Sequence, residues 1–124
     1  MYALPRHFLH RATTSWAPVL AFALLAGCQG RTITTTDFSK TFKLSPPATG
    51  AAVVGLILEV ELSATAPIQM NIGCGGAVHA RLTIPNGQQF RQRIDWYSDC
   101  ADISFSLGNA VAKSITVKYR FQTL

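Results

Sequence analysis

Apolar and polar residues alternate with a period of two along most of the chain after residue 37. The longest run, Val54 to Leu62, carries Glu59 and Glu61 between its apolar positions. A period of two is typical of strands that bury one face. Six further sets follow the same rule: Phe38, Phe42 and Leu44; Ile68, Met70 and Ile72; Val78, Ala80, Leu82 and Ile84; Phe90, Ile94 and Trp96; Ile103, Phe105 and Leu107; and Ile115, Val117, Tyr119 and Phe121.

Turn-forming residues, mostly Pro, Gly, Asn, Asp and Ser, separate these runs. Gly55 interrupts the longest run and predicts a bend or bulge there. About seven short strands with one apolar face each predict an all-β fold. We expect a small antiparallel β-sandwich over residues 38–124, with a small closed barrel as the alternative.

Residues 28–37 lack apolar periodicity and are rich in Thr. The segment is predicted to be a polar tether that spans about 30 Å when extended. Its Thr and Ile residues favour extended backbone, so an edge strand over Thr32 to Thr36 is the alternative.

One turn allows a strand register to be derived. Pro85, Asn86 and Gly87 suit a three-residue hairpin loop with a G1 bulge. That loop would pair residues 77–84 with residues 88–95 and set Leu82 opposite Phe90, so that apolar residues share one face. On the other face, the register would set Arg81 opposite Arg91 and His79 opposite Arg93.

The first 27 residues have the pattern of a secretory signal. Arg6 and Arg11 precede an apolar run from Trp16 to Leu25, which ends in small residues before Cys28. A transmembrane anchor is the alternative, but the run is shorter than the roughly 20 residues that a spanning helix needs, and Pro18 interrupts it. A signal in which Cys28 is incidental is a second alternative.

Leu24-Leu25-Ala26-Gly27-Cys28 resembles the lipobox of bacterial lipoproteins. The resemblance implies that the Cys28 thiol receives a diacylglycerol, that the signal is cleaved before it, and that the new amino terminus is acylated. The protein would then be exported and anchored to a membrane of the cell envelope by lipid alone. Gln29 stands where the family carries Asp for inner-membrane retention, which favours the outer membrane.

Composition limits the remaining possibilities. The chain downstream of the signal is about the size of one small domain. Its positive excess is mild, and together with export it argues against a nucleic-acid partner. Cys74 and Cys100 would be the only other thiols in an oxidising compartment, so they are predicted to form a disulfide.

The hairpin register suggests one candidate binding site. His79, Arg81, Arg91 and Arg93 would form a cationic stripe, and directly opposed cations favour an anionic partner. The alternative is that the stripe is solvated or neutralised by Asp95, Glu59 or Glu61. Tyr97 has opposite parity to Trp96 and is a candidate contact for a sugar or a protein partner.

Residues typical of catalysis are sparse. His79 is the only histidine downstream of the signal and lacks a nucleophile motif beside it. Asp99 and Asp102 flank Cys100 but show no calcium-loop signature. We therefore predict no catalytic residues, metal or cofactor. The sequence favours a non-enzymatic binding or structural module that engages an anionic envelope component or an envelope protein, with a small envelope-polymer hydrolase or an enzyme inhibitor as the alternative.

Overall fold

The computed structural model describes residues 30–47 and 50–124. The predicted signal and Cys28 lie outside the described residues. Eight strands form in the described part of the chain: β1 (Arg31–Thr35), β2 (Phe42–Lys43), β3 (Val53–Ala64), β4 (Ile68–Cys74), β5 (Ala77–Ile84), β6 (Gln89–Asp95), β7 (Asp102–Ser106) and β8 (Ala112–Thr123). None of the described residues belongs to a helix long and apolar enough to cross a membrane.

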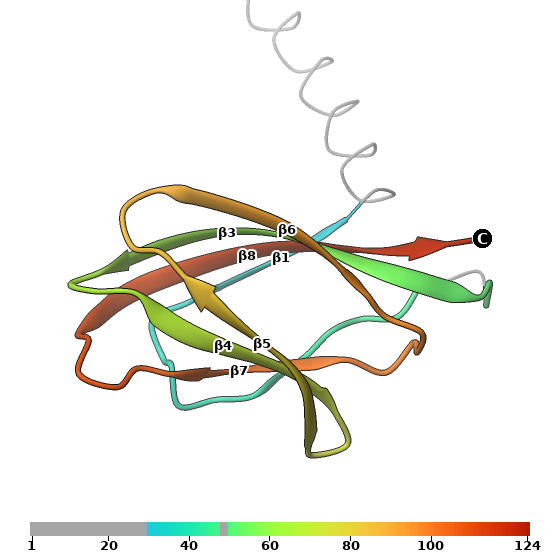
Figure 1. Ribbon diagram of the computed structural model, residues 1–124, viewed down its shortest axis with the longest axis horizontal. Helices are drawn as coiled ribbons and strands as arrows, with labels where there is room; N and C mark the ends of the chain where they lie inside the picture. The colour runs from blue at the N-terminus through green and yellow to red at the C-terminus, as the bar shows by residue number, and fades with distance from the viewer. Residues whose placement is uncertain (1–29, 48–49) are drawn as a thin grey trace, which may run out of the picture. The chain divides into compact units, whose positions relative to one another are not determined.

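The strands form two antiparallel sheets, which confirms the predicted all-β sandwich (Figure 1). The first, which we call sheet A, has the order β1-β8-β3-β6, and the second, sheet B, has the order β2-β7-β4-β5. Both long strands, β3 and β8, lie in sheet A and pair with each other. They form the centre of the face on which the candidate site lies.

The period-two pattern predicts the core well. The fully buried large side chains come from the alternating apolar sets of both sheets and from the segment after β2: Leu44, Leu56, Leu58, Val60, Met70, Ile72, Ile84, Ile103, Ile115 and Val117. Trp96 is also buried, and its indole N–H donates to the Cys100 carbonyl over 3.2 Å. That bond satisfies the one polar atom of the indole.

Two apolar residues depart from the alternation, and a bulge explains each. The β3–β8 register shifts between Val53 and Gly55, so Val53 is buried in place of Val54. Gly55 therefore marks an irregularity, as predicted. The β4–β5 register shifts between Ile72 and Gly73, and Val78 beyond it is 43% exposed. An extra residue in one strand reverses the faces of all residues that follow.

The predicted hairpin between residues 77–84 and 88–95 is wrong. β5 is the edge of sheet B and pairs with β4, whereas β6 is the edge of sheet A and pairs with β3. Figure 1 shows the connection between them passing from one layer to the other. The turn is held by β3, because the Gly87 N–H donates to the Leu62 carbonyl over 3.0 Å.

Electrostatics favours this crossover. The hairpin would have placed Arg81 opposite Arg91, whereas the observed register places Glu59 opposite Arg91. Opposite charges on facing strands stabilise a sheet and like charges destabilise it. In the observed sheet, β6 also pairs with β3 through seven residues.

The predicted tether is shorter than expected. Residues 31–35 form β1, which pairs with β8 through five residues from Arg31, opposite Tyr119, to Thr35, opposite Ile115. The edge-strand alternative is therefore correct for this segment. Ile33 packs against the core, and Thr32 and Thr34 lie on the outer face. The compact unit begins at Arg31 instead of residue 38.

The predicted disulfide is confirmed. Cys74 and Cys100 are bonded, with their Cα atoms 5.5 Å apart. The bridge connects neighbouring strands of sheet B, because Gly73 at the end of β4 lies opposite Asp102 at the start of β7. Its place is thus set by the β4–β7 pair.

Candidate functional site

The residues of the predicted cationic stripe lie on both sheets. Arg91 and Arg93 belong to β6 in sheet A, whereas Arg81 belongs to β5 in sheet B and lies opposite Asn71. His79 is also on β5, where its ring makes an edge contact with Trp96 at a centroid distance of 6.0 Å. The structure therefore does not bring these four residues into one stripe.

Arg93 is held by groups within the domain. Its guanidinium donates to the Asp95 carboxylate over 2.7 Å, to the Gln122 side-chain oxygen over 2.6 Å and to the Val54 carbonyl over 3.3 Å. The guanidinium lies over Gly55, where an added Cβ would approach it to 2.8 Å. Arg93 thus connects β6, β3 and β8, and its charge is neutralised by Asp95.

Arg91 also has an acidic neighbour. Its guanidinium lies 4.0 Å from the Glu59 carboxylate, at the limit of an ion pair. Lys118 lies opposite Glu59 on the other side of β3, so both cations flank one carboxylate. The alternative of neutralisation by acidic neighbours therefore applies to Arg91 and Arg93.

In the described part of the chain, three exposed cations of sheet A that have no ion pair lie near the start of β1, and a fourth, Lys113, lies at the other end of β8. Lys118 and Arg120 point to the outer face of β8. Arg31 lies opposite Tyr119 between them, so it has the inward parity of Ile33, but it is exposed because it is the first residue of β1. Among the described residues, none of the three has a carboxylate within 4.0 Å. We call Arg31, Lys118 and Arg120 the cationic corner.

Sequence reasoning missed the cationic corner as a site. The parity of β8 places Lys118 and Arg120 on the outer face, and that signal was available. The proximity of Arg31 was not, because it depends on β1 joining the sheet beside β8.

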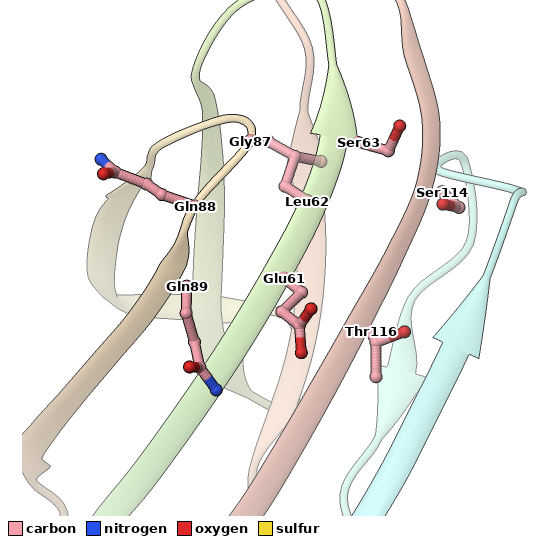
Figure 2. Close-up of a pocket in the computed structure, with 8 residues that line it drawn as sticks. All are labelled: Glu61, Leu62, Ser63, Gly87, Gln88, Gln89, Ser114 and Thr116. Carbon is pink, nitrogen blue, oxygen red and sulfur yellow. The ribbon is translucent and has the colours of Figure 1, made fainter.

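The same face carries a polar groove farther along β3. It has a volume of about 420 Å³ and lies where β3, β6 and β8 run side by side (Figure 2). Glu61 is placed between Gln89 on β6 and Thr116 on β8. The groove is also lined by Leu62, Ser63, Gly87, Gln88 and Ser114.

Glu61 gives the groove a negative charge. The carboxylate is exposed, and no cation lies within ion-pair distance of it in the described part of the chain. The hydroxyl and carboxamide groups around it can donate or accept hydrogen bonds. The groove is therefore suited to neutral or cationic polar groups, whereas anions are attracted to the cationic corner.

Tyr97 is 75% exposed and follows buried Trp96, as its parity predicted. It lines a second hollow, of about 300 Å³, together with Val53, Ser98 and Asp99. Within the described ranges, no group of three or more His, Cys, Asp or Glu residues has the arrangement of a metal site.

No protein-family model matches the sequence, and no curated protein matches it. Solved structures with a similar arrangement of strands include CsCBM6-3 from Clostridium stercorarium in complex with cellobiose, with 10% identity over 75% of this chain and 74% of that one and a TM-score of 0.47. Another is from the Bacillus endospore appendages, a family of disulfide-linked pili, with 12% identity over 77% of this chain and 86% of that one and a TM-score of 0.47. Likeness at this level carries no functional inference.

Proposed function

We propose that the protein is a lipid-anchored binding module of the cell envelope that engages an anionic envelope component through the cationic corner. The observation that carries this proposal is the exposed, unpaired state of Arg31, Lys118 and Arg120 among the described residues. The lipobox-like sequence that ends at Cys28 supports the anchor.

The spacing of these cations favours an anion between them. Lys118 and Arg120 are two residues apart on one face of β8, which corresponds to about 7 Å. Two like charges at that distance repel by about 0.6 kcal/mol in water. A phosphate or carboxylate group placed between them removes the repulsion and adds two attractive interactions.

Glu61 makes the charge on the outer face of sheet A uneven. Glu61 lies opposite Thr116, two residues from Lys118 along β8, so a negative and a positive region share the outer face of sheet A. A polyanion is repelled from the groove and attracted to the corner. We therefore expect the anionic partner to lie along β1 and β8 and not across β6.

The test is the binding of purified lipopolysaccharide to the detergent-solubilised protein. We expect Lys118→Glu with Arg120→Glu to weaken binding at least tenfold. Wild-type binding should also fall as salt rises, because the screening length is about 8 Å at physiological ionic strength. Arg81→Glu with Lys113→Glu is the matched control, since it makes the same charge change away from the corner.

Two results would overturn the proposal. One is lipopolysaccharide binding by the Lys118→Glu, Arg120→Glu variant that equals that of the wild type. The other is an equal loss in the control variant, which would mean that net charge and not the corner determines binding. The anchor is tested separately by the mass of the N-terminal peptide, which should carry acyl chains on Cys28.

A further inference from the structure

The position of β1 restricts how far the domain can lie from a lipid anchor. Only Gln29 and Gly30 separate Cys28 from Arg31, the first residue of β1. Three residue steps of fully extended chain span about 10 Å. If Cys28 carries the lipid, Arg31 lies within that distance of the thioether.

Sheet A extends beyond Arg31 in the direction of its N-terminus. Arg31 pairs with Tyr119, and β8 continues for four residues from there to Thr123. Four residues of strand add about 13 Å. This overhang is longer than the reach of the two-residue linker, so the end of the sheet can reach the depth of the anchor.

Several segments meet at this end of the sandwich, which we call the anchor end. β8 and β3 are joined there by a hydrogen bond from the Leu124 N–H to the Ala52 carbonyl. The segment after β6 returns there to β3, because the Trp96 N–H donates to the Val54 carbonyl. The disulfide adds the β4–β5 turn, since Cys100 follows Trp96 by four residues.

Exposed apolar side chains are concentrated at the anchor end. Of the four large apolar side chains that are exposed among the described residues, three lie there: Val78 at 43%, Tyr97 at 75% and Leu124 at 88%. The fourth, Val111, lies at the opposite end, where its carbonyl accepts from the Thr65 N–H after β3. Tyr is enriched at membrane interfaces, because its ring is apolar and its hydroxyl is polar.

We propose that the anchor end rests in the headgroup layer of the phospholipid bilayer that holds the lipid anchor. Tyr97 and Leu124 would enter the interface, and Arg31 and Arg120 would lie beside lipid phosphates, where cations near an anionic surface are attracted. This inference rests on the proposed function and specifies its anionic component as the phosphates of that bilayer.

Trp96 allows a direct test. It is the only tryptophan downstream of Cys28, and it lies next to Tyr97. The mature lipid-anchored protein is reconstituted into phosphatidylethanolamine and phosphatidylglycerol vesicles with bromine on the acyl chains. Bromine quenches tryptophan only at short range, and Trp96 is 7% exposed. We therefore expect bromines close to the headgroups to lower its emission measurably, and bromines near the bilayer centre to lower it less.

A longer linker distinguishes the affinity of the anchor end for the bilayer from mere proximity imposed by the short linker. Insertion of about twelve Gly and Ser residues between Gly30 and Arg31 allows the domain to move about 20 Å from its anchor. We expect quenching to persist in this form and to be lost when Tyr97→Asp and Leu124→Asp are added. Val111→Asp in the same lengthened protein is the matched control and should remain quenched.

The outcomes distinguish the two proposals. An acylated protein without quenching overturns the membrane-resting inference and leaves lipopolysaccharide binding in detergent unaffected. The inference is also overturned if, in the lengthened protein, the double variant Tyr97→Asp, Leu124→Asp is quenched as much as the control Val111→Asp. The exposed apolar side chains of the anchor end would then have no part in the membrane contact. A Cys28 without acyl mass overturns the anchor and the inference together.

Discussion

Removal of the disulfide should cost the domain a large part of its stability. The Cys74–Cys100 bond has a sequence separation of 26 residues. The loop-closure entropy of an unfolded chain with a loop of that length corresponds to about 3.5 kcal/mol at 25 °C. A domain of the size of Arg31–Leu124 is typically stable by about 5–14 kcal/mol.

The bridge is replaceable without loss of the fold around it. β4 and β7 are paired through five residues, from Gln69 opposite Ser106 to Gly73 opposite Asp102, and these main-chain bonds do not depend on sulfur. Cys74 and Cys100 are only partly buried, so substitution by Ala creates little empty space. The double variant Cys74→Ala, Cys100→Ala should therefore fold with the same topology and lower stability.

Urea unfolding, followed by the fluorescence of Trp96, measures the effect. For an m-value of about 1.5 kcal/mol/M, a loss of 3.5 kcal/mol lowers the midpoint by about 2 M. Thermal unfolding should show a melting temperature lower by about 15–25 °C. The reduced wild-type protein should match the variant, which is the control for effects of the substitutions themselves.

Two outcomes would refute the reasoning. The first is a midpoint in the oxidised wild type equal to that of the reduced protein. The second is alkylation of both Cys74 and Cys100 in unfolded protein that has not been reduced.

Three further predictions address other contacts. Gly73→Ala should cost about 2 kcal/mol in urea unfolding, because an added Cβ would overlap a main-chain carbonyl of β5 at the bulge. Tyr119→Phe should cost about 1 kcal/mol in the same assay, since its hydroxyl accepts the Ser45 N–H over 2.9 Å. The side chain and then the main chain of Ser39 donate to Asp37 and lower its pKa below 3.8, so an NMR titration of Ser39→Ala should show a higher pKa. Because the folded pKa is the lower one, this stabilisation is present above the unfolded value and is lost as pH falls through the folded pKa; an unchanged pKa in Ser39→Ala would contradict it.

The face that each strand buries was predictable, because a strand with one buried face has apolar residues at every second position. Leu56, Leu58 and Val60 are all buried at the positions that alternation assigns. Val78 was misassigned, because a bulge adds a residue without any change in composition. Gly in a strand often marks such a point, and two of the three register shifts have one beside them, Gly55 in β3 and Gly73 in β4; only the one at Gly55 was predicted.

Strand pairing was less predictable than burial. The turn Pro85-Asn86-Gly87 is compatible with a hairpin, but local turn chemistry does not determine which strand lies beside β6. The decisive partner is β3, which begins more than thirty positions earlier and offers Glu59 to Arg91. The candidate site depended on this pairing, and for that reason the predicted stripe was divided between two sheets.

If Cys28 carries the proposed lipid, the inclusion of β1 in sheet A leaves only Gln29 and Gly30 between the anchor and the domain. The domain would then stay close to the membrane, and its two ends would face different surroundings. Glu61 lies six residues beyond Gly55 on β3, about 20 Å farther from the anchor end. At an effective screening length of about 8 Å, a bilayer phosphate at the anchor end acts on Arg120 but hardly on Glu61. The proposed resting position on anionic lipid would therefore neutralise Arg31 and Arg120 and leave the groove around Glu61 exposed to the aqueous phase, where a cationic or hydroxyl-bearing partner can approach it.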